Sequence, residues 1–382
     1  MRVLDLSQNT AGAFCTLLLA ELGADVIKVE PPAGDPVRYG LEGEFAADFL
    51  NRRKRSITLD LDTAEGRRVF LLLARKTDAV VETFSPGTLD GMGLTFRQLK
   101  KANSAICLTS ISPFGRTGPR SSWVASELVA QAMGGIVATT GWDGEPPQKL
   151  PGHQAHYLAG LNAAIATAST VYGVRSGSAP SVHLDISIQE SLAPHWARHV
   201  SRYVYGGLKS YRRKRHSPGP QGFLDTVETR DGWLYILALR AEWEGFAVFL
   251  GLDEFVTHEW ADAQFRRDHW LEMEPAFRAA LGSRSKEEWF TAAAQQGFTF
   301  APIDDQVDAL ASPQLASREF FQDFMSSTGE QMRAPGLPFK VPSSAARPNV
   351  VPDAGQHTAE IMEELLGIAR SQPKVQKGAG IV

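Results

Sequence analysis

Hydrophobic positions in the first 115 residues alternate between two kinds of spacing. Short apolar runs typical of buried strands lie at 3–6, 26–29, 57–59, 79–82 and 106–110. Apolar residues recur at helical spacing at 12–22, 63–75 and 95–102. Strands that alternate with helices predict a parallel sheet with helices on both faces. We therefore expect a doubly wound, Rossmann-like α/β domain.

The first strand–helix–strand unit contains a turn of small residues. Ala11 and Gly12 follow the first apolar run, and their small side chains allow the backbone to approach a ligand closely. Open α/β sheets bind ligands at the carboxyl ends of their strands, so we expect a binding site beside this turn. The turn lacks the G-x-G-x-x-G pattern and gives no support to a nicotinamide cofactor.

The remaining two thirds of the chain predict a smaller domain and a return to the larger one. Patterns typical of three helices and one strand lie at 126–136, 157–173, 187–204 and 182–186. A basic loop rich in glycine and proline follows. A strand at 234–237 and a helix at 243–250 then indicate an α+β unit, and a last helix is expected at 357–367. The expected organisation is a large domain over 1–205, a linker over 206–222, a small domain over 223–305, a return to the large domain over 306–372 and a mobile tail over 373–382.

Composition narrows the class of protein. The chain has 382 residues and a net charge of −4, so it is long enough for two domains and shows no excess of basic residues for nucleic acid. No apolar run reaches membrane-spanning length and no signal peptide is visible. Cys15 and Cys107 lie in apolar surroundings and are predicted to be buried, reduced thiols. We expect a cytoplasmic protein with neither a nucleic-acid nor a membrane partner.

Five further motifs follow the opening unit in chain order. They lie at 51–56, 80–87, 112–119, 129–135 and 355–358. With the opening unit, their order and spacing over about 360 residues resemble the class III CoA-transferases (CaiB/BaiF), the family of formyl-CoA transferase and carnitine CoA-transferase. The resemblance implies coenzyme A as a substrate or co-substrate, an acyl-CoA or carboxylic acid substrate, and a dimer of two interlocked subunits.

The resemblance also implies a carboxylate nucleophile, at which this chain departs from the family. The family aspartate lies four residues before a glycine that begins a helix of small residues. The matching glycine is Gly160, and the position four residues earlier holds His156. There is no other carboxylate between Glu145 and Asp185. Because an imidazole cannot form the aspartyl anhydride or the aspartyl thioester, the family mechanism cannot be carried over unchanged.

The sequence leaves more than one role open for His156. The positive end of a helix disfavours an imidazolium, so we expect a neutral ring that could act as a general base or a weak nucleophile. Alternatively, His156 fills the position in an inactive protein, or a partner subunit supplies the aspartate. Glu127 is the nearest carboxylate candidate, since relatives often carry an acid there, but it could also be a satisfied buried acid. Ala125 replaces the histidine of the racemase branch, so a racemase is not expected.

Two histidines raise the question of a metal. His153 and His156 are three residues apart and could share a helix face. Two histidines with no third ligand do not make a metal site, so no metal is expected.

The resemblance places coenzyme A beside the opening turn. Arg38, Lys54 and Arg55 match positions that contact the CoA phosphates in relatives, and cations suit a polyphosphate. A solvated charge run is the alternative. Ala11 and Gly12 would approach the ligand, and Thr83 with Phe84 matches the family's Asn-Phe beside the pantetheine. Gly91 replaces an arginine at the nucleotide end, and the basic run 212–215 either compensates or is an exposed loop.

The sequence therefore predicts a class III CoA-transferase-like protein with altered catalysis, because His156 occupies the position of the nucleophile. Two other functions stay open. The chain could be a non-catalytic subunit that pairs with an aspartate-bearing homologue, or a fold that uses His156 as a general base in a different reaction. Both a homodimer and a heteromer with a homologous subunit are compatible with the sequence.

Overall fold

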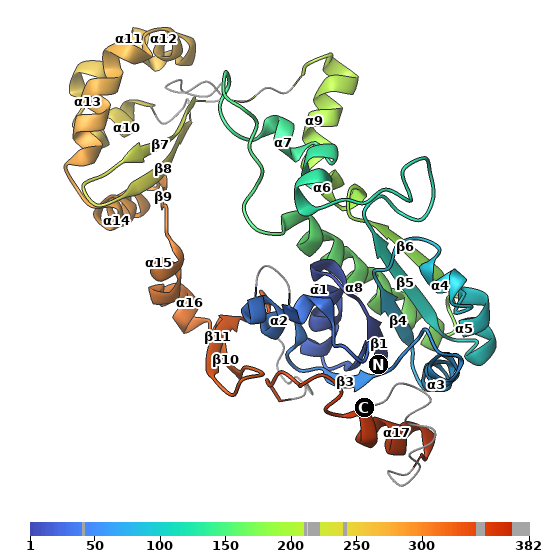
Figure 1. Cartoon of the computed structure of the whole chain (residues 1–382). Coiled ribbons are helices and arrows are strands. Elements are labelled where there is room, and N and C mark those ends of the chain that lie inside the picture. The colour runs from blue at the N-terminus through green and yellow to red at the C-terminus, as the bar shows by residue number, and fades with distance from the viewer. Residues whose placement is uncertain (40–42, 210–211, 213–221, 240–242, 341–347, 369–382) are drawn as a thin grey trace. The chain divides into compact units, whose positions relative to one another are not determined.

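The computed structural model describes residues 1–39, 43–209, 212, 222–239, 243–340 and 348–368. The described residues fall into two compact units (Figure 1). The larger unit takes its residues from Met1–Ala138, Gln148–Ser210 and Glu319–Val382. The smaller unit takes them from Thr139–Pro147 and Tyr211–Arg318. The tail expected at 373–382 and most of the linker expected at 206–222 lie outside the described residues.

A parallel six-stranded sheet forms the centre of the larger unit. Its strands are β1 (Arg2–Leu6), β2 (Asp25–Glu30), β3 (Arg55–Thr58), β4 (Ala79–Glu82), β5 (Cys107–Ser112) and β6 (His183–Ser187). Their order is β3-β2-β1-β4-β5-β6, and every neighbouring pair is parallel. The expected doubly wound sheet is confirmed. The chain reverses its direction across the sheet between β1 and β4, where ligands bind in open sheets of this kind.

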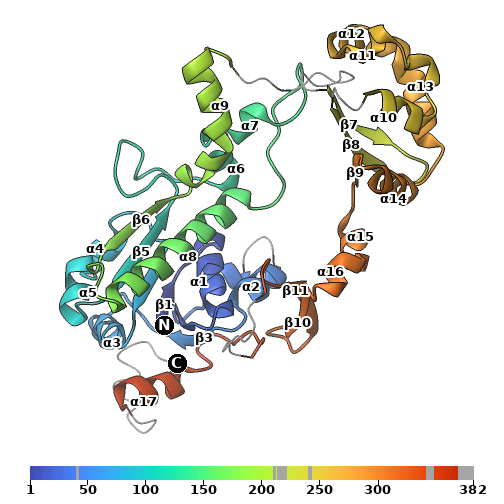
Figure 2. The same cartoon turned by 180° about the vertical axis from the view of Figure 1, so that it is seen from behind.

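Helices cover both faces of this sheet (Figures 1 and 2). The covering helices are α1 (Thr10–Glu21), α8 (Gln154–Arg175), α3 (Ala64–Ala74), α5 (Phe96–Ala102) and α17 (Thr358–Leu366). Successive residues of β1 point to opposite faces, so Val3 packs with α1 and α8 while Leu4 packs with α3, α5 and α17. Cys15 and Cys107 are free and buried, as expected.

Small residues allow α1 and α8 to pack closely. A Cβ atom on Gly160 would lie 2.5 Å from the carbonyl oxygen of Ala11 and 3.2 Å from the amide nitrogen of Cys15. Only glycine allows this approach, because such contacts are shorter than van der Waals distances. The beginning of α8 is thereby held beside the first turns of α1.

Other elements of the larger unit differ in part from the sequence prediction. They are α2 (Gly43–Asn51), α4 (Thr88–Gly91), α6 (Glu127–Met133), α7 (Ile136–Thr139), which ends in the smaller unit, α9 (Ala193–Gly206) and the antiparallel hairpin of β10 (Phe321–Met325) and β11 (Gln331–Pro335). The single helix expected at 126–136 is interrupted, because Gly135 has a φ of 83° that ends the helical path. The helix expected from 187 begins at Ala193, after a short 3₁₀ turn at Glu190–Leu192.

The smaller unit combines an antiparallel sheet with helices. The sheet has the order β7-β8-β9, from β7 (Gly222–Glu228), β8 (Trp233–Leu239) and β9 (Thr299–Pro302). The helices are α10 (Trp243–Leu250), α11 (His258–Ala261), α12 (Ala263–Asp268), α13 (Trp270–Gly282), α14 (Lys286–Gln296), α15 (Gln306–Ala311) and α16 (Pro313–Ser317). Aromatic side chains dominate its core, among them Phe246, Phe277 and Trp289. The expected smaller α+β unit is confirmed.

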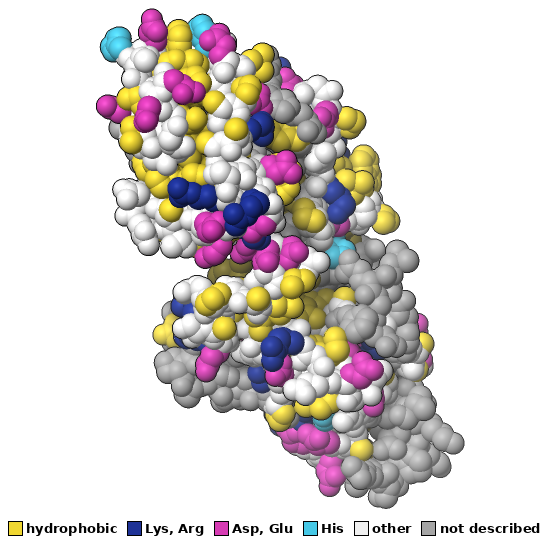
Figure 3. Space-filling view, turned by 90° about the vertical axis from the view of Figure 1, so that its left-hand side faces the viewer, with side chains coloured by type: hydrophobic (Ala, Val, Ile, Leu, Met, Phe, Trp, Pro, Cys, Tyr) yellow, Lys and Arg dark blue, Asp and Glu magenta, His cyan; other side chains and the backbone are white. Residues whose placement is uncertain are grey.

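The described helices and one face of the described surface bear on membrane and charge properties. Among the helices that the structure describes, none combines the length and the apolar character needed to cross a bilayer. Figure 3 shows basic and acidic side chains interspersed with hydrophobic ones over the described part of one face. This mixture agrees with the small net charge of −4.

Candidate active site at the beginning of helix α8

Two residues that the sequence indicated separately form one hydrogen-bonded pair. Glu127 begins α6, and His156 lies in the first turn of α8. The Nδ1 atom of His156 lies 2.5 Å from Oε2 of Glu127. The same carboxylate accepts hydrogen bonds from the backbone N–H groups of Ala155 at 2.8 Å and His156 at 3.2 Å. Glu127 therefore satisfies the beginning of α8 and contacts the imidazole at the same time.

The charge of Glu127 determines the orientation of the imidazole. Burial alone would raise the pKa of Glu127, but hydrogen bonds from His156, Gln131 and the Ala155 amide outweigh burial and lower the pKa to about 2. The carboxylate is therefore ionised and can only accept hydrogen bonds. Nδ1 of His156 must donate the proton in the 2.5 Å contact, which leaves Nε2 as the nitrogen that can accept a proton when the ring is neutral.

A buried glutamine fixes the position of Glu127. The Nε2 group of Gln131 donates to Oε1 of Glu127 at 2.7 Å, and its Oε1 atom accepts from the Leu150 amide at 2.8 Å. Glu127 and Gln131 are one helical turn apart on α6, which places their side chains on the same side. Only 9% of the Glu127 side chain and 13% of the His156 side chain are exposed. The pair is nearly enclosed and held by the backbone on both sides.

A second histidine completes a cluster of three possible ligands. His153 is the residue that precedes α8, and its ring centroid lies 5.8 Å from that of His156, with the two planes at 89°. One ligand atom from each of Glu127, His153 and His156 can be chosen so that all three lie within 4.8 Å of one another. The sequence indicated the two histidines but no third ligand, whereas the structure places Glu127 beside them.

The turn at Ala11 and Gly12 begins helix α1. The side-chain oxygen of Asn9 accepts hydrogen bonds from the amides of Ala11 at 3.1 Å and Gly12 at 3.3 Å. A Cβ atom on Gly12 would lie 2.3 Å from Cβ of Ser7 and 2.5 Å from Cγ2 of Thr83. The lack of a side chain at Gly12 is thus needed for packing of the chain against itself, and the two predicted residues Gly12 and Thr83 are neighbours.

Arg38 contacts a carboxylate at the end of β2. Its guanidinium donates two hydrogen bonds of 2.7 Å to Glu30 and one of 3.0 Å to the carbonyl oxygen of Pro352. The Arg38 side chain keeps 11% of its surface exposed, while that of Glu30 is fully buried. Arg38 therefore combines a protein partner with access to solvent.

The two neighbouring cations predicted at the phosphates are buried in ion pairs. Lys54 Nζ contacts Asp5 at 2.9 Å, and neither side chain is exposed. Arg55 is 1% exposed and contacts Asp25 at 2.6 Å, with two further carboxylates from α17, Glu360 and Glu364, around its guanidinium. Each of these cations is thus already paired with a carboxylate inside the protein, unlike cations on a solvated loop.

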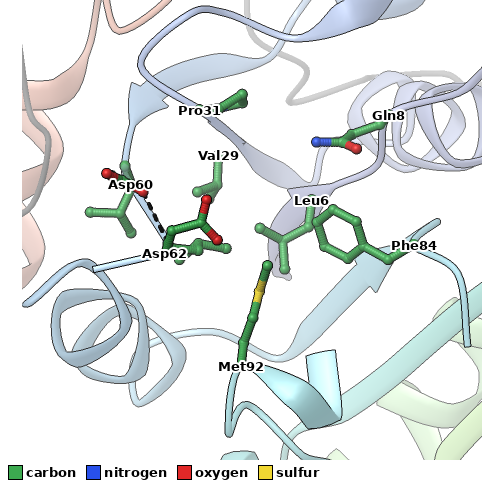
Figure 4. A pocket seen from close by; sticks show the side chains of 10 residues that line it. Leu6, Gln8, Val29, Pro31, Asp60, Asp62, Phe84 and Met92 are labelled. Carbon is green, nitrogen blue, oxygen red and sulfur yellow. Dashed lines mark hydrogen bonds between the residues drawn. The ribbon is translucent and has the colours of Figure 1, made fainter. Parts of the chain in front are cut away.

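A cavity lies at the carboxyl ends of the strands of the larger unit (Figure 4). It has a volume of about 120 Å³. Its walls come from residues that end or follow β1, β2, β3 and β4, namely Leu6, Gln8, Val29, Pro31, Leu59, Asp60, Leu61, Asp62 and Phe84, together with Met92. The Phe84 ring, the Gln8 amide and the Asp62 carboxylate surround the same space (Figure 4). Of the predicted CoA-binding residues, the structure brings Phe84 to this cavity.

Sequence reasoning missed Gln8, Asp60 and Asp62 as lining residues. Each follows a predicted strand, and the position at the carboxyl end of a parallel strand was the signal that could have identified them. Gly91 lies at the end of α4, and a Cβ atom there would meet no atom within 4 Å. In the basic run 212–215, Arg212 donates to the carbonyl oxygens of Trp142 and Glu145 at 3.0 Å, and 213–215 lie outside the described residues.

Comparison with known proteins agrees with this fold over nearly the whole chain. The model of CoA-transferase family III matches residues 1–358. The chain is 30% identical to the succinyl-CoA:(R)-benzylsuccinate CoA-transferase subunit BbsE of Thauera aromatica, over 95% of this chain and 93% of that protein. It is 31% identical to the succinyl-CoA:mesaconate CoA-transferase of Haloarcula marismortui, over 95% of each chain. The crystal structure of a CaiB/BaiF family protein from Brucella suis superposes with a TM-score of 0.83 and 27% identity, over 96% of this chain and 98% of that one.

Proposed function

This chain belongs to CoA-transferase family III, and from that premise we propose that it acts on CoA thioesters of carboxylic acids with the Glu127–His156 pair at its reaction centre. The observation that carries the proposal is the 2.5 Å hydrogen bond between His156 Nδ1 and Glu127 Oε2 at the beginning of α8. A carboxylate behind an imidazole is the arrangement that orients a histidine base and stabilises the imidazolium that it forms.

The pair favours proton transfer over the aspartyl chemistry of the family. With Nδ1 bound to Glu127, Nε2 of His156 can take a proton from the group that attacks the thioester carbonyl. A carboxylate acceptor has no proton to lose at neutral pH, so a base is useful only when water or another protic group attacks. In this proposal the CoA thiolate leaves, the attacking oxygen forms the new acyl bond, and the proton passes from His156 to the departing sulfur.

For the CoA moiety, we assign the cavity at the carboxyl ends of the strands. Its apolar walls and the ring of Phe84 suit a flat or apolar part of the ligand. Thr83 accepts from the amide of Gln8, which lines the cavity, and packs against Gly12 of the turn formed by Ala11 and Gly12. Arg38 is the most exposed of the three predicted cations, so we assign the phosphate contact to it. Lys54 and Arg55 support this edge of the sheet through their buried ion pairs.

Mass spectrometry combined with thiol release tests the proposal. Purified protein is incubated with succinyl-CoA, with and without a carboxylic acid acceptor, and free CoA and new thioesters are quantified. We expect release of free CoA, with or without the acceptor, that falls at least tenfold in His156→Ala and is unchanged in the control His258→Ala, an exposed histidine of α11. An aspartyl or glutamyl adduct, or full activity of His156→Ala, would refute the role of the pair.

A second function is supported by the outer face of α8. Leu161, Ile165 and Tyr172 are 41%, 58% and 76% exposed, and their spacing places them along one side of the helix. Apolar residues gathered in this way are typical of a surface that contacts another chain. One relative is also named as a subunit of its transferase. In this alternative the chain is a non-catalytic subunit that pairs with an aspartate-bearing homologue.

Light scattering and co-expression separate the two functions. A protein that releases CoA from acyl-CoA by itself supports the catalytic function. An inactive protein that gains CoA transfer only when mixed with a homologous, aspartate-bearing chain supports the subunit function. A monomer at micromolar concentration in both experiments would contradict the expected dimer in either form.

A further inference from the structure

Three possible metal ligands lie close together at the beginning of α8. Metal binding by them would be a property separate from the proposed acyl-CoA chemistry. Glu127, His153 and His156 each offer one ligand atom, and these atoms all lie within 4.8 Å of one another. We propose that the three side chains bind one divalent transition-metal ion, with Zn²⁺ as the probe. Two imidazoles and one carboxylate form a donor set that such ions bind well.

The geometry requires side-chain adjustments in both directions. Zinc in a tetrahedral site binds imidazole nitrogen and carboxylate oxygen at about 2.0–2.2 Å, so two ligand atoms of one ion are about 3.4 Å apart. Separations of up to 4.8 Å must therefore shorten by about 1 Å, and the 2.5 Å between His156 Nδ1 and Glu127 Oε2 must lengthen by about as much if both atoms bind the ion. His153 and His156 are anchored close together, because one immediately precedes α8 and the other lies in its first turn. Rotation of the two rings, now at 89° to each other, can bring their nitrogens toward the carboxylate.

The surrounding hydrogen bonds prepare the carboxylate for an ion. Gln131 and the Ala155 amide hold Oε1 of Glu127 at 2.7 and 2.8 Å, which fixes the orientation of the carboxylate. Outer hydrogen bonds of this kind position the ligands at metal sites. The 2.5 Å contact between His156 and Oε2 now contains a proton, and an ion bound at this position would replace that proton.

The positive end of α8 does not prevent binding. A helix N-terminus disfavours cations because its amides carry partial positive charge. Here the amides of Ala155 and His156 donate to Glu127, so a full negative charge lies against them. Three protein ligands leave a further position for water or a substrate oxygen, as at catalytic zinc sites and unlike closed structural ones.

Metal analysis of the full chain, free of affinity-tag histidines and treated first with a chelator, tests the inference without acyl-CoA. After equilibrium dialysis against Zn²⁺, we expect one ion per chain by mass spectrometry. Co²⁺ in its place should give visible absorption bands of a low-symmetry site. His153→Ala and Glu127→Gln should each weaken Zn²⁺ binding at least tenfold, while His258→Ala should bind as the parent does.

Two results would overturn the metal site. One is no retained Zn²⁺ in the folded parent, with folding verified by circular dichroism. The other is retained Zn²⁺ whose affinity does not change in His153→Ala, which would place the ion elsewhere. Because the ion would replace the proton between His156 and Glu127, the acyl-CoA assay uses the chelated, metal-free chain, and the two results are then independent. Metal binding together with absent acyl-CoA activity would support this inference and refute the proposed function alone.

Discussion

Replacement of Lys54 by methionine tests whether this residue supports the fold or contacts a ligand. The family resemblance places Lys54 at a phosphate, whereas the structure surrounds its ammonium group with acceptors. Nζ lies 2.9 Å from Asp5, 3.1 Å from the Ala13 carbonyl oxygen and 3.1 Å from Asn51. Methionine keeps the unbranched chain and its volume, so Lys54→Met removes the charge with little loss of packing.

The magnitude follows from what remains around Asp5. Removing one partner of a buried ion pair costs about 3–5 kcal/mol, because the other charge stays buried without compensation. Asp5 would keep Lys28 at 3.8 Å and hydrogen bonds from Ser7 and Thr16. Burial also lowers the pKa of Lys54 to about 8 despite the charge of Asp5. The buried ammonium group of Lys54 is therefore itself unfavourable, and its removal offsets part of the loss in folding free energy. We therefore expect the lower end of the range, about 3 kcal/mol.

The assay is urea unfolding followed by far-ultraviolet circular dichroism, fitted with two transitions because the chain has two units. The double variant Asp5→Asn/Lys54→Met should be more stable than Lys54→Met alone, since it removes the uncompensated carboxylate. Calorimetry with CoA provides the second measurement. A Lys54→Met protein that unfolds within 1 kcal/mol of the parent but binds CoA at least tenfold more weakly would refute this reasoning and establish a ligand contact.

Three further predictions use the same unfolding assay. Gly160→Ala should lower the free energy of unfolding by about 1–3 kcal/mol, because its Cβ would lie 2.5 Å from the Ala11 carbonyl oxygen. Gly91→Ala should raise the free energy of unfolding by up to about 1 kcal/mol, because its Cβ meets no atom within 4 Å and alanine favours the helix. Equal changes in the free energy of unfolding for Gly91→Ala and Gly160→Ala would contradict the packing argument. Burial alone would raise the pKa of Glu30, but Arg38 holds it below the ordinary value of about 4.5. The contribution of the Glu30 carboxylate to stability is therefore complete above that value and is lost as the pH falls through the pKa of the folded state. Glu30→Gln should make the free energy of unfolding depend less steeply on pH in the acid range, and an unchanged slope would count against this.

The parallel sheet could be predicted from sequence because each of its first strands has a short apolar core between helical patterns. The first four strands begin within two residues of the expected positions, since both faces of the sheet are buried and apolar residues therefore cluster in each strand. The hairpin of β10 and β11 was missed for the opposite reason. Only Phe324 and Ala334 of its ten residues are buried, so hydrophobic spacing gives almost no signal there.

The candidate site was predicted as residues but not as an arrangement. Glu127 and His156 were both named, yet they are 29 residues apart, and only the fold shows that they share a hydrogen bond. The run containing Lys54 and Arg55 looks like a solvated charge cluster in the sequence. It is buried because Asp5, Asp25 and Glu364, which lie far away in the chain, supply the carboxylates. Long-range pairing of this kind leaves no local pattern to read.

The position of α17 late in the chain has a consequence for the order of events during synthesis. Segment 355–364 donates to and accepts from β3, with a bond of 2.9 Å from the His357 amide to Ser56, and its Glu364 contacts Arg55. About 300 residues separate these partners. The edge strand of the sheet therefore leaves the ribosome long before the segment that completes it, and the whole smaller unit emerges in between. Until that segment emerges, Arg55 has Asp25 but lacks Glu360 and Glu364, so this edge of the sheet can be completed only after the smaller unit has been synthesised.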